Sequence, residues 1–126
     1  MVDFNFEKLE VWQMAIDLCQ YAYRITAKFP DEEKYGLTQQ LRRATVSVAS
    51  NIAEGSGRVT LKDKTHFINM AFGSLMEAVA QMHIAHRVGY ADEDTSLQFK
   101  VQAKALSGKL NAYAHALGHP QAKKTP

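Results

Sequence analysis

The chain is 126 residues long, with 46% hydrophobic residues, 22% charged residues and a formal net charge of +2. This size and composition predict one compact domain and leave no room for a second. Only 7 Gly and 3 Pro are present, which argues against an all-β fold and favours long helices. The small net charge lacks the strong basic bias of a dedicated nucleic-acid-binding domain, so composition alone indicates no partner.

The first predicted helix spans residues 6–29 and ends before Pro30, because proline disfavours helical geometry in the residue before it. Its apolar residues form two rows at helical spacing: Leu9, Trp12, Ile16, Cys19 and Tyr23 in one, and Val11, Ala15, Leu18, Ala22, Ile25 and Phe29 in the other. Together the rows cover about 200° of the helix surface, more than one core face needs, so we expect a second buried contact. The single cysteine, Cys19, is interpreted as a small core residue rather than a reactive thiol.

The second predicted helix begins near Asp31 or near Thr38 and ends at Gly55-Ser56-Gly57, where we expect a left-handed glycine. Its core-type positions are Leu37, Leu41, Ala44, Val48, Asn51 and Gly55. An asparagine at such a position is unusual. The small residues beside it, Ala44, Ser47 and Ser50, would let another helix approach closely.

The third predicted helix begins at Thr60, which has the spacing of a capping box with Asp63, and it ends at Gly89. Its core side consists of Leu61, Ile68, Ala71, Phe72, Leu75, Ala78, Val79 and Met82.

The fourth predicted helix follows Asp92-Glu93-Asp94, whose carboxylates complement a helix N-terminus, and ends at Gly118 and Pro120. Its apolar seam has heptad spacing and consists of Phe99, Ala103, Leu106, Leu110, Tyr113 and Leu117.

Four helices with short connections predict an all-α fold, an up-down-up-down antiparallel four-helix bundle. We expect the bundle domain to span residues 1–118 and residues 119–126 to form a disordered tail. The N-terminus has no apolar signal region, and no segment reaches the roughly 18 apolar residues needed to span a bilayer. The sequence therefore predicts a soluble cytoplasmic protein without membrane contact.

Patterns for catalysis or metal binding are weak. The chain has no Glu-x-x-His pair, which argues against a di-iron centre, and His83 and His86 are interpreted as structural or interface residues. The GSGR segment at residues 55–58 lacks the Gly-Lys-Ser/Thr ending of a phosphate-binding loop. We expect no cofactor, no metal and no enzymatic activity; an enzyme remains a third hypothesis.

Charge is distributed unevenly along the chain. Residues 1–34 carry four Lys/Arg against seven Asp/Glu, a net −3, whereas the later segments are weakly basic. The candidate nucleic-acid-binding residues are Arg42, Arg43, Arg58, Lys62, Lys64, Lys100 and Lys104. Such side chains bind nucleic acid by displacing counterions from its backbone. The alternative is a solvated basic surface that pairs with the acidic first helix.

The segment QLRRATVSVASNIAEGSGR, residues 40–58, resembles the core motif of bacterial four-helix bundle proteins first associated with intervening sequences in 23S ribosomal RNA genes. Further matching segments are FEKLEVWQMA at 6–15, FPDEEKYGLTQQLRRA at 29–44 and FINMAFGSLMEA at 67–78. The same superfamily includes the accessory variability determinants of diversity-generating retroelements. The resemblance implies a four-helix bundle that assembles into a ring-like homopentamer, and the accessory determinants bind nucleic acid and a reverse transcriptase.

Several polar residues occupy motif positions in this resemblance: Arg42, Arg43, Asn51, Glu54, Gly55 and Glu77. Val79 stands where family sequences often carry a second acidic residue. We expect the arginines to bond carboxylates across helices or subunits and the asparagine to fix helix register. A ligand site at these residues is the alternative interpretation.

The leading hypothesis is a non-enzymatic oligomeric bundle that binds nucleic acid or a nucleoprotein partner through a basic surface repeated around a ring. The second hypothesis is a protein-binding scaffold with no nucleic-acid contact.

Overall fold

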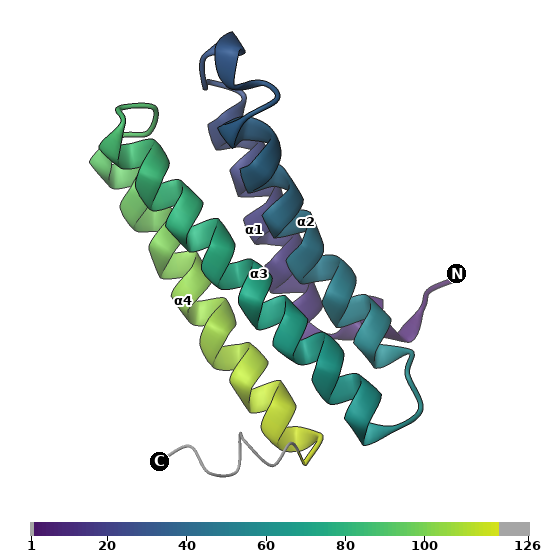
Figure 1. Ribbon diagram of the computed structural model, residues 1–126. Coiled ribbons are helices and arrows are strands. Elements are labelled where there is room, and N and C mark those ends of the chain that lie inside the picture. The colour runs from purple at the N-terminus through teal and green to yellow at the C-terminus, as the bar shows by residue number, and fades with distance from the viewer. Residues whose placement is uncertain (1, 119–126) are drawn as a thin grey trace.

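The computed structural model describes residues 2–118, which form four α-helices and two short 3₁₀ helices. The elements are η1 Asn5–Lys8, α1 Glu10–Thr26, η2 Asp31–Glu33, α2 Leu37–Ser56, α3 Leu61–Arg87 and α4 Glu93–Ala116. Figure 1 shows consecutive helices running in opposite directions. α1 packs against α2 and α4, and α3 packs against the same two helices. The predicted all-α, up-down-up-down four-helix bundle is confirmed.

Two predictions concern the ends and surroundings of this bundle. The predicted disordered tail, residues 119–126, lies outside the described residues, as does the predicted helix stop at Pro120. Within residues 2–118, none of the helices combines the length and the hydropathy that a membrane crossing requires.

α1 is shorter than the predicted helix over residues 6–29. Leu9 has extended backbone angles, so the preceding residues form the separate turn η1, and α1 ends at Thr26. The row that contains Val11 and Leu18 is buried in the core. In the other row Trp12 and Cys19 are half-buried and Tyr23 is exposed, so the prediction that Cys19 is a core residue is wrong.

α2 begins at Leu37, near the second of its two predicted starts, and Asp31 opens the separate turn η2. The predicted left-handed glycine stop is wrong, because Gly57 has a φ of −88° and Gly55 lies inside the helix. Gly55 has a packing role instead: a Cβ atom placed there would lie 2.9 Å from the Cβ of Phe67 on α3. This glycine allows α2 and α3 to approach each other closely.

α3 begins after Thr60 and ends before Gly89, as predicted, whereas α4 begins at Glu93, inside the acidic triplet that was expected to precede it. The side chain of Thr60 accepts a hydrogen bond of 3.1 Å from the Asp63 amide, and Asp92 accepts one of 2.8 Å from the Thr95 amide. Gly89 and Gly118, just beyond the two helix ends, have φ angles of 91° and 80°. Both glycines adopt the left-handed conformation typical of helix C-termini.

The core is formed by one face of each helix. Its largest fully buried side chains are Phe99, Leu18, Leu41, Ile52, Leu75, Met82, Leu106 and Leu110. Several predicted core positions differ. Leu61 is exposed, and the half-buried ones are Leu37, Asn51, Phe72, Val79 and Leu117. On α4, Ala114 is buried where the heptad pattern places Tyr113. The last difference is expected because a straight helix drifts by about 20° per heptad, which moves the buried face to a later residue.

A side-chain contact joins the α1–α2 and α3–α4 connections. The Tyr90 hydroxyl donates a hydrogen bond of 2.9 Å to the Glu33 carboxylate, and the Tyr90 ring lies 5.6 Å from that of Phe29. The other Glu33 oxygen accepts a 2.9 Å bond from the Leu37 amide at the start of α2. The Leu37 amide and the Tyr90 hydroxyl together hold the pKa of Glu33 below its ordinary value.

Candidate nucleic-acid interface

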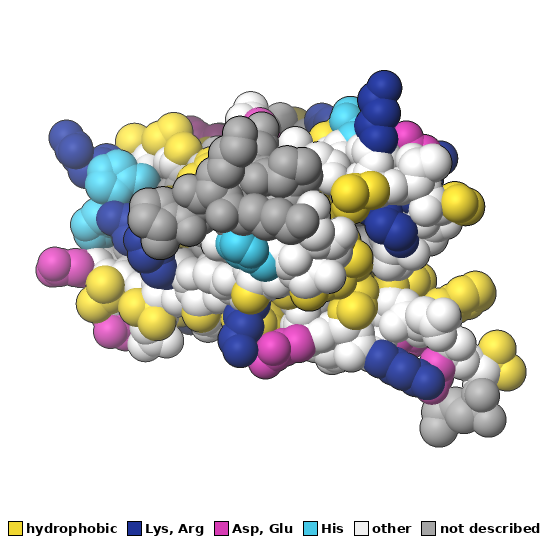
Figure 2. All heavy atoms as spheres, turned by 90° about the horizontal axis from the view of Figure 1, so that it is seen from below, with side chains coloured by type: hydrophobic (Ala, Val, Ile, Leu, Met, Phe, Trp, Pro, Cys, Tyr) yellow, Lys and Arg dark blue, Asp and Glu magenta, His cyan; other side chains and the backbone are white. Residues whose placement is uncertain are grey.

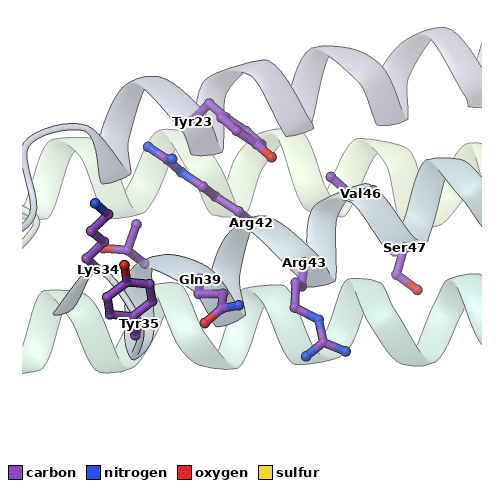
Figure 3. Close-up of a pocket in the computed structure, with 9 residues that line it drawn as sticks. Tyr23, Lys34, Tyr35, Gln39, Arg42, Arg43, Val46 and Ser47 are labelled. Carbon is purple, nitrogen blue, oxygen red and sulfur yellow. The ribbon is translucent and has the colours of Figure 1, made fainter.

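The two adjacent arginines of α2 point in different directions. In Figure 3, Arg42 extends toward Tyr23 on α1, whereas Arg43 extends to the opposite side of α2. Arg43 is exposed and lines a hollow between α2 and α3 together with Glu77 and Gln81. Neither arginine forms an ion pair with a carboxylate of residues 2–118. The two arginines therefore flank α2, with Arg42 on the side of α1 and Arg43 on the other side.

The guanidinium of Arg42 is held in place by α1. Its Nε donates a 2.8 Å hydrogen bond to Oγ1 of Thr26, and its central carbon lies 4.5 Å from the centroid of the Tyr23 ring. The Thr26 hydroxyl in turn donates a 2.7 Å bond to the carbonyl of Ala22. A cation over an aromatic face is attracted by the ring quadrupole. Arg42 is thus fixed by two independent contacts.

An open groove of about 600 Å³ runs over this part of α2 (Figure 3). It is lined by Tyr23, Lys34, Tyr35, Thr38, Gln39, Arg42, Arg43, Val46 and Ser47. Three of these side chains are cationic and none carries a carboxylate, so the groove favours a negatively charged ligand. Sequence reasoning found the two arginines but missed Lys34 and Tyr35, although a lysine followed by a tyrosine just before a helix is visible in the sequence.

The candidates around the α2–α3 connection form a second group. Arg58 donates a 2.9 Å bond to Glu54, and its guanidinium lies 4.8 Å from the Phe67 ring centroid. Lys64 Nζ donates a 3.2 Å bond to the Ser56 carbonyl, while Lys62 is exposed. At about 1.5 Å per residue, the length of α2 separates this group from Arg42 by roughly 20 Å.

Lys100 and Lys104 form a third group, exposed on α4, a helix that does not contact α2. Figure 2 views the bundle from the end that holds the α2–α3 connection, and on this face Lys and Arg side chains are scattered among Asp and Glu. The predicted pairing of basic residues with the acidic first helix is limited, within residues 2–118, to Lys109 and Glu10 at 3.4 Å. The seven candidate residues therefore do not form one continuous patch.

The motif residues make separate contacts within the chain. Asn51 Nδ2 donates to the Ser47 carbonyl at 2.9 Å and to the Ser47 hydroxyl at 3.0 Å, within its own helix. The Ser47 hydroxyl also shares a 2.8 Å hydrogen bond with Ser74 on α3. Glu54 bonds Arg58 rather than Asn51, and Glu77 is exposed. Within residues 2–118, neither Arg42 nor Arg43 bonds a carboxylate of another helix, and the contacts expected between subunits stay a prediction.

The two histidines of α3 that were considered as metal ligands, His83 and His86, have different surroundings. His86 Nδ1 lies 3.0 Å from the Ala91 carbonyl, so this ring bonds the turn that follows α3, and His83 is exposed. No three His, Cys, Asp or Glu side chains of residues 2–118 converge in a way that could hold a metal ion.

Comparison with known families decides the relationship of this chain. Residues 7–112 match the family described as 23S rRNA-intervening sequence protein. The chain belongs to this family. The resemblance carried by residues 40–58 is thereby confirmed, and the family match extends over all four helices of the bundle.

A solved structure supports the same fold for this member of the 23S rRNA-intervening sequence family. It is the crystal structure of a protein of unknown function from the S23 ribosomal protein family of Bacteroides thetaiotaomicron. The two proteins are 14% identical, with a TM-score of 0.74 over 82% of this chain and 97% of that chain. Such low identity supports the fold alone. Among curated proteins, none matches this chain significantly.

Proposed function

We propose that this chain is a non-enzymatic, oligomeric four-helix bundle that binds nucleic acid through basic surface residues. The observation that carries the proposal is that most of the candidate cations have no carboxylate partner in the described part of the chain. Among residues 2–118, Arg58 is the one candidate that pairs with a carboxylate, and the other six form no ion pair. Lys and Arg side chains without an ion pair can replace the counterions of phosphate groups. The family description, which refers to a ribosomal RNA sequence, agrees with such a ligand.

Oligomerisation is the second part of the proposal, with the homopentamer of the sequence resemblance as the expected form. The outer row of α1 supports it, because Trp12, Ile16 and Cys19 are only half-buried, whereas Tyr23 belongs to the groove over α2. A second copy packed on Trp12, Ile16 and Cys19 would remove their remaining apolar surface from water. Repetition of weak cationic sites around a closed assembly would raise the affinity for a long polyanion.

The test of nucleic-acid binding compares two variants with the same change in charge. The candidate variant carries Arg43→Gln, Lys62→Gln and Lys64→Gln, and the control carries Lys8→Gln, Lys28→Gln and Lys109→Gln. Binding of duplex and structured RNA is measured by fluorescence anisotropy between about 50 and 200 mM salt. We expect the candidate variant to bind more weakly and with a shallower salt dependence. Equal losses in both variants, or no binding by the native chain at low salt, would refute the proposal.

The test of assembly is native mass spectrometry of the full chain and of Ile16→Glu. We expect a closed oligomer that dissociates when a charge enters the outer row of α1, because that charge would lose its hydration in the interface. A native monomer at micromolar concentration would contradict the oligomeric part of the proposal.

A protein-binding scaffold, with a reverse transcriptase as one partner suggested by the superfamily, is the second candidate. It is favoured by exposed apolar side chains outside the groove, including Leu97 and Val101 one turn apart on α4. An intact oligomer that binds no nucleic acid at low salt would favour the scaffold.

A further inference from the structure

The groove over α2 has features that a general basic surface does not require. It combines three cations with two exposed aromatic rings, and its lining contains no carboxylate. Tyr35 is 82% exposed and Tyr23 is 43% exposed. A nonspecific contact with a phosphate backbone needs charge alone, whereas exposed rings beside the charges offer a surface on which planar groups stack.

Arg42 is prepared to receive an anion. Its Nε is occupied by Thr26 and its plane is held against Tyr23, but its terminal nitrogens donate no hydrogen bond to residues 2–118. Those nitrogens form the planar fork that matches the oxygens of a phosphate. Because the side chain is already fixed, little conformational entropy is lost when the anion binds. The neighbouring Arg43 has no such restraint and supplies charge.

Tyr35 supplies the second kind of contact. It lies in the connection before α2, and Lys34 Nζ lies 5.5 Å from its ring centroid. The ring is otherwise open to solvent, so it contributes little to the core. A ring so placed can stack on the base of a nucleotide whose phosphate is held by a neighbouring cation.

We propose that this groove binds a single-stranded segment of nucleic acid, with phosphates at Arg42, Arg43 and Lys34 and an unpaired base on Tyr35. The proposal rests on the nucleic-acid-binding function above and adds the form of the ligand. The bases of a duplex are stacked on each other and their faces cannot reach a protein ring, so stacking on Tyr35 requires an unpaired strand. RNA and DNA strands share these phosphates and bases, and the titration below compares both.

The experiment uses ligands that separate phosphate binding from base stacking. Fluorescence anisotropy measures binding of the full chain to a uridine strand, a thymidine strand, an abasic DNA strand of equal length, and a duplex. The variants are Tyr35→Ala, Tyr35→Phe and the control Leu97→Ala, an exposed substitution on α4. A second pair, Arg43→Gln and the control Lys8→Gln, compares one lost charge inside the groove with one at an exposed lysine outside the candidate residues. Circular dichroism and light scattering establish that each variant keeps its fold and assembly.

We expect the native chain to bind strands with bases more tightly than the abasic strand. Tyr35→Ala should lose at least about fivefold affinity for the strands with bases and none for the abasic strand, while Tyr35→Phe and Leu97→Ala retain binding. Arg43→Gln should weaken binding of all strands and reduce the salt slope by about 0.7, and Lys8→Gln should have a smaller effect on both the affinity and the slope.

Three outcomes would overturn the inference. If Tyr35→Ala binds every ligand like the native chain, no base stacks on this ring. If the native chain binds the duplex but not the single strands, the groove does not select an unpaired strand. In both cases nucleic-acid binding itself survives. If no ligand binds at low salt, the inference and the proposed function fail together.

Discussion

Replacement of Gly55 by alanine tests whether the close packing of α2 on α3 depends on a missing side chain. The added Cβ would lie 2.9 Å from the Cβ of Phe67 and 3.6 Å from the carbonyl oxygen of Lys64. Both neighbours are part of, or directly attached to, the α3 backbone, so neither can rotate away. Gly73, in the middle of α3, is a matched control because a Cβ there has no atom within 4 Å.

The expected magnitudes follow from two opposing effects. Alanine in place of glycine in a helix stabilises by about 1 kcal/mol, since the unfolded chain loses less freedom on folding. At Gly73 nothing opposes this gain, so Gly73→Ala should stabilise by about that amount. At Gly55, overpacking costs about 1–3 kcal/mol, so Gly55→Ala should range from neutral to about 2 kcal/mol less stable. In a chain of this size, 1 kcal/mol corresponds to a Tm shift of about 4 °C.

Thermal unfolding followed by far-ultraviolet circular dichroism measures the difference. All proteins are compared at one concentration, because assembly would make Tm depend on concentration. We expect Gly73→Ala to unfold at a higher temperature than the native chain, and Gly55→Ala at a temperature at least about 4 °C below Gly73→Ala. If Gly55→Ala stabilises as much as Gly73→Ala, the close approach of the two helices does not require this glycine.

Three further substitutions test caps, pH dependence and the core. Thr60→Ala removes the side-chain acceptor of the Asp63 amide, and denaturant unfolding should show a loss of about 1 kcal/mol. Because the pKa of Glu33 is lowered in the folded chain, its contribution to stability is present above its ordinary pKa and is lost as pH falls through the folded value. Glu33→Gln should therefore lower Tm at neutral pH, and the difference should shrink in acid. Leu106→Ala empties a fully buried position and should cost about 2–5 kcal/mol in the same denaturant titration.

For each of these three substitutions, one outcome would contradict the expected result. An unchanged unfolding midpoint for Thr60→Ala would mean that the cap bond contributes nothing. A Tm difference for Glu33→Gln that is constant from neutral to acid pH would mean that ionisation of the Glu33 carboxylate does not stabilise the fold. A loss below about 1 kcal/mol for Leu106→Ala would mean that the core refills the space.

The boundaries that sequence predicts correctly are those set by local signals. Thr60, Asp92, Gly89 and Gly118 act through atoms within a few residues, so their roles can be deduced from the neighbouring sequence. Gly55 is different, because its use depends on Phe67 in another helix, and the same Gly-Ser-Gly sequence is equally compatible with a helix stop. Tertiary packing, rather than local preference, decides between those two possibilities.

In the candidate interface, too, some features follow from the local sequence and others depend on tertiary packing. The charged residues are evident from the sequence, and within residues 2–118 six of the seven candidates form no ion pair, which agrees with the weakly basic later segments. The opposite directions of Arg42 and Arg43 depend on α2 having α1 on one side and α3 on the other. The participation of Lys34 and Tyr35 depends on the turn that precedes α2, a geometry that no apolar periodicity predicts.

The Glu33–Tyr90 hydrogen bond gives the two helical hairpins a second point of attachment. The α1–α2 and α3–α4 hairpins are linked covalently at one end of the bundle, and this hydrogen bond fastens them at the other. Rotation of one hairpin away from the other would have to break it first. Lys34 and Tyr35 directly follow Glu33, so a strand bound at those two residues would also slow the opening of the hairpins. Hydrogen exchange near Tyr90, remote in sequence from the groove, would then report its occupancy.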